Sequence, residues 1–185
     1  MTYDLIPPTD PRVLSSIAPF DEKVFKEQEK ITTKEFAGNM FETMKKYGGI
    51  GLSANQCGKP YRMFVMGDHP NIKEGKKWVC YNPEIKGYSK ETIKYKEGCL
   101  TFPYLFIDIE RPRAVAVVYY EENMKKVEEN LTGMPARIYQ HEFDHMQGIV
   151  FTEKVSKFKL QFAMKKRDNV VKKVKRQWQQ ITNQK

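Results

Sequence analysis

Cysteine is scarce in this chain of 185 residues, and no apolar run approaches the roughly 18 residues that a membrane-spanning helix needs. Three thiols, Cys57, Cys80 and Cys99, are an odd number, which makes a disulfide framework a poor interpretation. The first residues, MTYDLIPPTDPRVL, have neither the charged and apolar regions of a signal peptide nor an Arg-rich transit composition. These scarcities predict a soluble, cytoplasmic protein.

Acidic residues are almost missing from one part of the chain. Residues 154–185 contain 11 Lys and Arg and a single acid, whereas residues 1–153 contain 21 Lys and Arg and 22 acids. A nearly neutral body with a strongly basic tail favours a polyanionic partner for the tail, such as RNA or an anionic surface. A solvated helix face that only aids solubility is the alternative, and charge alone leaves both open.

The first half of the chain changes from a helical to a β-rich pattern. Four prolines predict irregular structure over the first thirty residues. Thr32 and Glu35 then form a capping-box pattern before an amphipathic run that ends at Gly48 and Gly49, so a helix is expected there. Runs rich in β-formers predict strands over 61–66, 78–85, 91–95, 113–121 and 124–131.

Two more helices are expected after the strands. Residues 134–146 return to helical periodicity, and residues 156–181 predict one long helix whose apolar stripe is interrupted by Arg167. There are no repeats and no linkers. We therefore expect one α+β domain, with a body over 1–155 and a basic C-terminal helix over 156–185 that packs on the body or projects from it.

Histidine is as scarce as cysteine, and two of the three histidines occur in the run HEFDH at 141–145. Histidines four residues apart on a helix share one face and can bind one metal ion. The glutamate between them can act as a general base on metal-bound water. An exposed helix with mixed charges is the alternative. Met134 and Ile138 share the face of His141 and His145, which favours the metal site because unliganded histidines are costly to bury.

A hydrolytic metal site needs a third protein ligand and one open coordination position. No histidine follows His145, and few acids do. Upstream, Cys99 lies in the run EGCLT at 97–101, a glycine-containing turn after a predicted strand, and could supply a thiolate. Two alternatives stay open here: a buried structural thiol, and a metallopeptidase with a downstream His or Glu ligand.

A third run, GIGLSANQ at 49–56, combines two glycines with small residues. Such a segment allows the backbone to approach a ligand closely. The amide of Gln56 could donate a hydrogen bond to a developing oxyanion. A phosphate-binding loop is excluded because no Gly-Lys-Ser/Thr follows, whereas an ordinary turn after a helix is still possible.

These three runs, in this order, resemble the motifs of the peptide deformylase family: Gly-apolar-Gly-apolar-Ala-Ala-x-Gln, Glu-Gly-Cys-Leu-Ser and His-Glu-x-x-His. The resemblance extends from TDPRVL near the N-terminus to about residue 160. It implies an α+β fold with mixed or antiparallel β-sheets around a central metal-binding helix, followed by a C-terminal helix. It also implies hydrolysis of the N-formyl group of formylmethionine on nascent polypeptides, with release of formate.

The resemblance assigns a role to each matching residue of the reaction centre. Glu142 corresponds to the general base and acid, which activates a metal-bound water for attack on the formyl carbon. Gln56 and the backbone N–H of Leu100 correspond to the donors that stabilise the oxyanion. The metal ligands correspond to Cys99, His141 and His145.

Four further residues correspond to substrate contacts in the family. Gly51 matches the glycine whose backbone pairs with the extended substrate. Ile50, Met134 and Ile138 fall where the family builds the pocket for the methionine side chain, and an apolar lining suits a thioether. Phe106 lies near the place where many bacterial members have an arginine that contacts the substrate backbone, so the anchoring of the substrate beyond methionine stays open.

The family also implies cofactor and partners. Fe²⁺ is the expected native metal, with Zn²⁺, Ni²⁺ or Co²⁺ as possible occupants, because a Cys/His/His set suits several first-row ions. The expected partners are N-formylmethionyl nascent peptides and the ribosome, reached near the exit tunnel through the basic C-terminal helix. Neither a membrane nor DNA is expected. The alternative is an RNA- or ribosome-binding module that keeps the fold without activity.

Several residues near these motifs are expected to have no functional role. Arg137, one turn before His141, is predicted to be exposed, and His69 is predicted to lie at the surface. Ser53 and Thr101 depart from the family pattern, but both are small.

Overall fold

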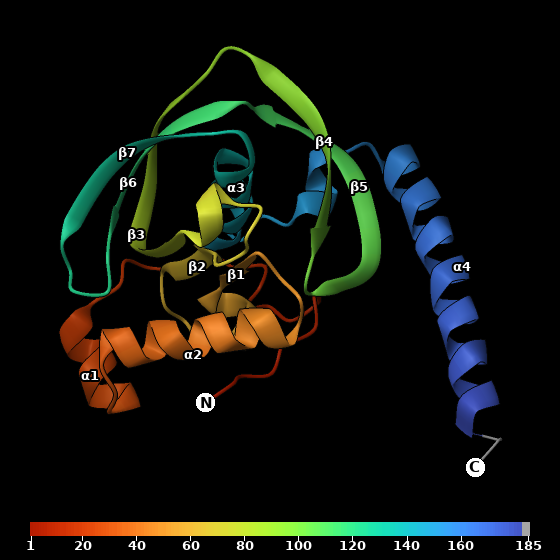
Figure 1. The fold of residues 1–185 in the computed structure, drawn as a ribbon, viewed down its shortest axis with the longest axis horizontal. Helices are drawn as coiled ribbons and strands as arrows, with labels where there is room; N and C mark the ends of the chain where they lie inside the picture. The colour runs from red at the N-terminus through yellow and green to blue at the C-terminus, as the bar shows by residue number, and fades with distance from the viewer. Residues whose placement is uncertain (183–185) are drawn as a thin grey trace.

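Seven strands and four α-helices make up the computed structural model, which describes residues 1–182 (Figure 1). The α-helices are α1 (Glu22–Glu29), α2 (Thr33–Lys46), α3 (Gly133–Met146) and α4 (Lys157–Thr182). The strands are β1 (Gly51–Ser53), β2 (Met63–Gly67), β3 (Lys77–Tyr88), β4 (Thr92–Cys99), β5 (Phe102–Pro112), β6 (Ala114–Tyr120) and β7 (Lys126–Thr132). Short 3₁₀ helices are η1 (Ala54–Cys57), η2 (Lys73–Gly75) and η3 (Phe151–Lys154).

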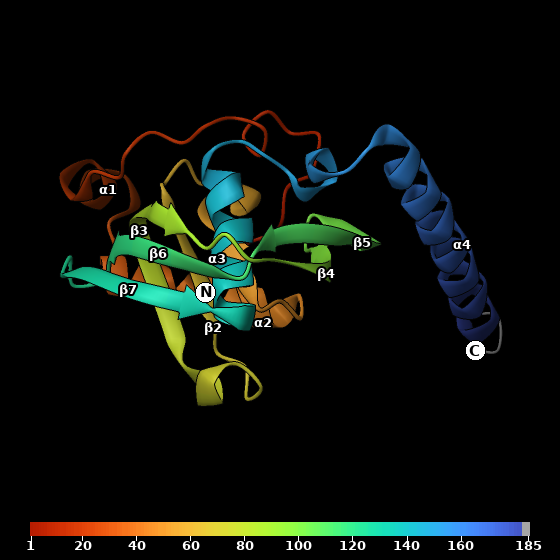
Figure 2. The same ribbon diagram turned by 90° about the horizontal axis from the view of Figure 1, so that it is seen from above.

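The strands form two antiparallel sheets that enclose α3. The larger sheet has the order β1-β2-β3-β6-β7, and the smaller one is the hairpin β4-β5. Helix α3 packs against β1, β2, β6 and β7, and it lies at the centre of the body in Figures 1 and 2. The predicted α+β fold, with antiparallel sheets around a central helix, is therefore confirmed.

Strand β2 contributes to two hydrophobic cores because successive side chains of a strand point to opposite faces. Phe64 and Met66 pack with residues of α3, whereas Met63 and Val65 pack with residues of α2. All four side chains are fully buried. The larger sheet is thus covered on both faces, and α3 is held firmly against one of them.

The N-terminal region departs from its prediction in one respect. Thr32 and Glu35 do form the capping box at the start of α2. The first thirty residues, however, are not irregular throughout, because they contain α1. Asp21 caps this helix by accepting hydrogen bonds from two backbone N–H groups of its first turn, and Phe25 is buried beneath it. The four prolines all precede Asp21 and do not interrupt the helix.

All five predicted strands are present, as β2, β3, β4, β6 and β7, but β1 and β5 were not predicted. Strand β1 has only three residues. Strand β5 alternates the buried side chains of Leu105, Ile107 and Ile109 with exposed ones, which is the period of a half-buried strand.

Helix α4 is the predicted C-terminal helix, and its first half packs on the body. Leu160, Ala163 and Met164 contact the apolar side of β5. Beyond them Trp178 and Ile181 are exposed, and Figures 1 and 2 show the helix standing beside the body. The predicted segment 156–185 ends in residues 183–185, outside the described part. Among the helices of residues 1–182, none combines the length and apolarity needed to cross a membrane.

Candidate metal centre and active site

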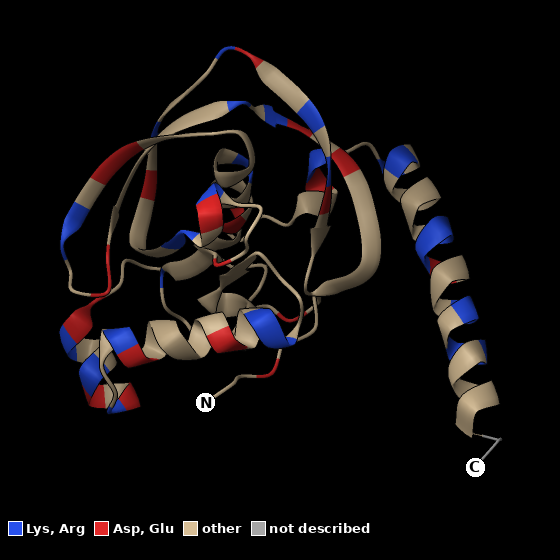
Figure 3. Cartoon of the chain, viewed as in Figure 1, with Lys and Arg blue, Asp and Glu red and all other residues tan. Residues whose placement is uncertain are grey.

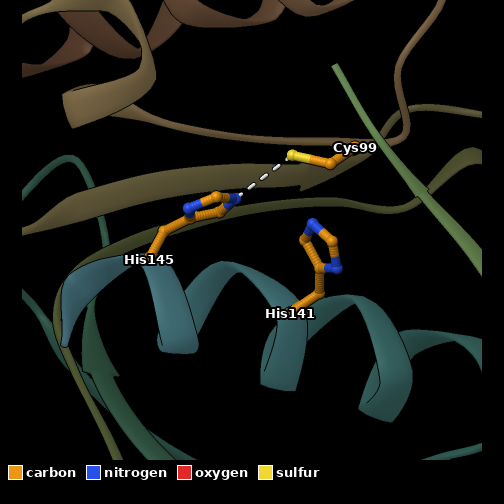
Figure 4. A group of neighbouring side chains, drawn as sticks. All are labelled: Cys99, His141 and His145. Atoms are coloured by element: carbon orange, nitrogen blue, oxygen red, sulfur yellow. Dashed lines mark hydrogen bonds between the residues drawn. The ribbon is translucent and has the colours of Figure 1, made fainter. Parts of the chain in front are cut away.

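Helix α3 carries the two histidines of the predicted metal site on its buried face. His141 and His145 lie one turn apart, with 5.2 Å between their ring centroids (Figure 4). Their side chains are 9% and 1% exposed. A buried imidazole needs a partner for its nitrogen atoms, so this face of α3 requires either hydrogen bonds or a metal ion.

Cys99, on the β4-β5 hairpin, lies close to both histidines. It ends β4, and its Sγ lies 3.4 Å from Nε2 of His145. One donor atom from each of the three residues lies within 4.8 Å of the others. Figure 4 shows the three side chains pointing toward one another. Burial opposes ionisation of Cys99, but the two imidazoles outweigh it and hold the pKa of this thiol well below its usual range. A thiolate is the form that binds metal.

The structure therefore brings together the three predicted ligands, and the donor set fits a first-row divalent ion. Within residues 1–182 this is the one cluster of His, Cys or acidic side chains with metal-binding geometry. The alternative ligand set, with a His or Glu downstream of the helix, therefore finds no support. Cys80 is buried in the core, and Cys57 is half-buried outside the cluster.

Glu97 holds His141 in place and was not predicted as a site residue. Its Oε2 lies 3.0 Å from Nδ1 of His141, which leaves Nε2 of the ring to face the cluster. Burial raises the pKa of Glu97, but His141 and Arg111 outweigh it, so the carboxyl is ionised. The signal in the sequence was an acid two residues before the candidate ligand Cys99.

The prediction that Arg137 is exposed is wrong. Arg137 is 6% exposed, and its Nη1 donates to Oε1 of Glu97 at 2.6 Å and to the carbonyl of Ile109 at 3.1 Å. Arg111 also donates to Glu97, at 2.7 and 3.0 Å. Because α3 is central, the side of the helix next to His141 faces the β4-β5 hairpin and not solvent. Two guanidinium groups therefore balance the buried carboxylate behind the metal centre.

Glu142 lies beside the cluster with a free carboxyl oxygen. Its side chain is 4% exposed, and its Oε2 has no hydrogen-bond partner within residues 1–182. Burial raises the pKa of Glu142 to about 7, a value suited to accepting and returning a proton near neutral pH. A Cβ atom at Gly51 would lie 2.4 Å from Oε1 of Glu142 and 2.8 Å from Cγ2 of Ile138, so any larger residue there would displace these side chains.

The side-chain amide nitrogen of Gln56 is directed at Cys99 of the cluster. Its Oε1 accepts hydrogen bonds from the backbone N–H of Ser53 at 3.0 Å and from the Ser53 hydroxyl at 2.8 Å. Its Nε2 then donates to Sγ of Cys99 at 3.3 Å. Both Ser53 and Gln56 are buried. The amide hydrogens are therefore directed toward the metal centre, as an oxyanion donor needs.

A cavity of about 590 Å³ opens from this centre between the segment that follows α2 and the β4-β5 hairpin. Its lining includes seven of the predicted site residues: Ile50, Gly51, Gln56, Cys99, Leu100, His141 and Glu142. His145 does not line the cavity, although its Nε2 lies 3.4 Å from Sγ of Cys99. Met134 and Ile138 do not line the cavity. Ile138 is buried beneath Gly51, and Met134 packs on the main core.

A thiolate and two imidazoles at the base of a cavity, with a carboxyl of raised pKa and an amide donor beside them, define a metal-dependent hydrolase. The sequence pattern of the polypeptide deformylases matches residues 12–161. The chain belongs to the peptide deformylase family.

Relatives and solved structures agree with this assignment. The chain is 38% identical to peptide deformylase from Thermotoga maritima over 160 residues, which is 86% of this chain and 89% of the relative. It is 41% identical to the chloroplastic peptide deformylase 1B of Solanum lycopersicum over 123 residues, which is 66% of this chain and 44% of that protein.

Two solved structures have the same fold. The crystal structure of the Thermotoga maritima peptide deformylase aligns with a TM-score of 0.72 at 35% identity, over 84% of this chain and 99% of that one. The Thermus thermophilus peptide deformylase aligns with a TM-score of 0.78 at 29% identity, over 91% and 95%. These similarities do not support the alternative of an inactive RNA- or ribosome-binding module.

Proposed function

We propose that this member of the family removes the formyl group from N-formylmethionine on nascent polypeptides and releases formate. The observation that carries the proposal is the convergence of Cys99, His141 and His145 at the base of a cavity that also presents Glu142 and Gln56. A formamide is a weak electrophile. Its hydrolysis needs an activated water, a polarised carbonyl and a proton for the departing amine, and these side chains can meet those needs.

Cys99, His141 and His145 would hold one divalent metal ion. When bound, such an ion lowers the pKa of water and polarises a carbonyl oxygen. We propose Fe²⁺ as the native ion, and the mixed thiolate and imidazole set also accommodates Zn²⁺, Ni²⁺ or Co²⁺. Glu97 fixes the ring of His141, and the guanidinium groups of Arg111 and Arg137 donate hydrogen bonds to its carboxylate.

Glu142 moves the proton in this proposal. Its unpartnered Oε2 accepts a proton from the attacking water, and the same carboxyl then donates that proton to the leaving nitrogen. The side-chain amide of Gln56 and the backbone N–H of Leu100 donate hydrogen bonds to the formyl oxygen as negative charge develops on it.

The substrate would enter in extended form along β1. We propose that the backbone of Gly51 pairs with the peptide and that Ile50, which lines the cavity, contacts the methionine side chain. We propose that Ile138, beneath Gly51, and Met134, which packs against the main core, add to the apolar surroundings from outside the cavity lining. Because nascent chains are the substrate, we propose a cytoplasmic location.

The test is formate release from a short formyl-methionyl peptide. The protein is purified without oxygen, loaded with Fe²⁺, and compared with Glu142→Ala at matched metal content. We expect turnover in the wild type and a loss of at least about 100-fold in the variant. A folded, metal-loaded wild type that releases no formate would refute the proposed function.

We further propose that α4 binds the ribosome near the exit tunnel, where formylated chains emerge. Lys and Arg recur along α4 from Lys157 to Arg176, as the blue segments in Figure 3 show, and the outer half of the helix is exposed. Contacts between such a helix and RNA phosphates would be weakened by salt. A ribosome-bound enzyme would also meet its substrate at a higher rate.

The ribosome proposal is tested by charge removal. Replacing Lys172, Lys173, Lys175 and Arg176 with glutamine should weaken ribosome binding and flatten its salt dependence. The control replaces four exposed lysines of the body, Lys23, Lys34, Lys90 and Lys94, with glutamine. Equal binding by the two variants would contradict a role for α4.

A further inference from the structure

The turn that carries Gln56 also carries a side chain directed at the metal-centre helix. Asn55 directly precedes Gln56 in η1 and is 0% exposed. Successive side chains of a 3₁₀ helix point about 120° apart, because this helix has three residues per turn. Gln56 reaches Cys99 on the β4-β5 hairpin. Asn55 reaches α3 instead, where its Nδ2 donates a hydrogen bond to the carbonyl of His145 at 3.0 Å.

The carbonyl of His145 lies at the C-terminal end of α3. The last carbonyls of an α-helix have no partner further along the helix, so the end frays unless other groups bind them. Helix α3 ends at Met146, one residue after this candidate metal ligand. The carbonyl of His145 accepts from the backbone N–H of Gly148 at 3.2 Å as well as from Asn55. Asn55 thus connects the backbone of His145 to the segment that carries Gln56.

The amide nitrogen is the part of Asn55 that makes this connection. Its Nδ2 also lies 3.4 Å from the carbonyl of Arg12, and a backbone carbonyl can only accept, so the nitrogen faces both carbonyls. Its Oδ1 is buried and has no hydrogen-bond partner within residues 1–182. Leucine has nearly the same branched shape and no donor. Asn55→Leu therefore removes the hydrogen bond while it keeps most of the volume of the side chain.

Two hydrogen bonds from one turn fix the place of the Gln56 amide at the metal centre. Gln56 binds Sγ of Cys99 at 3.3 Å, and Asn55 binds the backbone of His145. The turn itself is closed by the N–H of Gly58, which donates to the carbonyl of Asn55 at 3.0 Å. Misplacement of a catalytic group by about 1 Å can lower a rate by about 100-fold, so such connections matter for an oxyanion donor.

We propose that Asn55 is a positioning residue, which holds the Gln56 amide at its working distance from the metal centre through the backbone of His145. The inference rests on the proposed function, in which Gln56 stabilises the oxyanion. The family motif leaves position 55 open, so the pattern itself does not predict this connection. A purely structural role is the competing explanation, because a buried hydrogen bond between residues 90 positions apart also stabilises the fold.

Kinetics with formyl-Met-Ala-Ala separate the two explanations. In the Fe²⁺-loaded protein, Asn55→Leu and Asn55→Ala should each lower kcat about 5- to 30-fold and change KM by less than about 2-fold. In a Gln56→Ala background, Asn55→Leu should lower kcat by less than a further 2-fold or so, because the group that it positions is missing.

Asn82→Ala is the matched control. Asn82 also joins distant segments, because its Oδ1 accepts from the N–H of Phe20 at 2.6 Å and its Nδ2 donates to the carbonyl of Phe20 at 3.1 Å. It does not line the cavity. Urea unfolding should show a loss of stability in Asn82→Ala and in Asn55→Ala, whereas kcat should fall in Asn55→Ala alone.

A second readout does not depend on turnover. The amide of Gln56 donates to Sγ of Cys99, so it stabilises charge on the thiolate. In the Co²⁺-loaded protein, Asn55→Leu should therefore shift the thiolate-to-metal charge-transfer band to longer wavelength, in the direction expected for Gln56→Ala. The double variant should show no larger shift than Gln56→Ala, and Asn82→Ala should leave the band in place.

The contrary results can be told apart. An unchanged kcat, a loss that persists in full in the Gln56→Ala background, or an equal loss in Asn82→Ala would overturn the positioning role while the proposed function stands. If the wild type hydrolysed no formyl peptide, the proposed function would fail. An unshifted Co²⁺ band in Asn55→Leu would then refute the positioning role separately.

Discussion

The Ser53 hydroxyl donates a 2.8 Å hydrogen bond to Oε1 of Gln56, beside the bond that the Ser53 backbone N–H gives to the same oxygen. A backbone N–H can only donate, so the atom facing it must be the amide oxygen. The nitrogen of Gln56 is thereby directed at Cys99. Ser53 stands where the family pattern has alanine, and its hydroxyl adds a second restraint on the amide.

We predict that Ser53→Ala lowers kcat by about 2- to 10-fold, the value of one hydrogen bond of ~0.5–1.5 kcal/mol. KM should change little, because the restraint matters most when the oxyanion forms. In a Gln56→Ala background the same substitution should have no further effect on kcat. An equal loss in both backgrounds would show that Ser53 acts through general packing and not through Gln56.

Cys99→Ala should abolish stoichiometric metal binding, because only two imidazoles are left. Metal content per chain after purification and dialysis measures this. Cys57→Ala is the matched control, since burial raises the pKa of Cys57 to about 12 and keeps it a neutral thiol outside the cluster. If the Cys99→Ala protein still bound one metal ion per chain, Cys99 would not be a metal ligand.

Arg137→Ala should lower the free energy of unfolding by about 3–5 kcal/mol, because it removes one partner of a buried carboxylate. Urea unfolding of both proteins measures the difference. Arg113→Ala is the control, because Arg113 and Glu91 form an exposed ion pair, and its loss should cost less than about 1 kcal/mol. Similar losses for the two variants would contradict a buried Arg137.

The Fe²⁺-loaded protein should lose activity in air. A thiolate beside ferrous iron is prone to oxidation, and Cys99 is held as a thiolate by its surroundings. Half-lives of activity measured with and without oxygen, and again after loading with Ni²⁺, test this. Equal half-lives for the iron form in both atmospheres would disprove it.

The three residues of the candidate metal centre could be brought together from the sequence because each lies in a short motif whose local structure is nearly independent of the rest. His141 and His145 share a helix face by spacing alone, and Cys99 ends a strand. Arg137 could not be placed in this way. Its exposure depends on what covers α3, and its partner Glu97 is 40 residues away in the sequence.

The wall of the cavity was less predictable, because it too depends on contacts between residues far apart in the sequence. The wall of the cavity is made by β5, a strand that the sequence analysis missed, and by a bulge that a register shift creates. Neither the place of Tyr104 nor the contact of Arg167 with Pro103 follows from hydrophobic periodicity. Both require knowledge of how α4 and the hairpin meet.

The position of strand β2 between two cores affects how the protein unfolds. Its odd-numbered residues Met63 and Val65 belong to the core under α2, and Phe64 and Met66 belong to the core under α3. One short strand is thus common to both cores. Unfolding of either core should therefore disrupt the other one as well. The helix that carries the histidines and the helix on the far side of the sheet should therefore lose protection from hydrogen exchange together, as one cooperative unit.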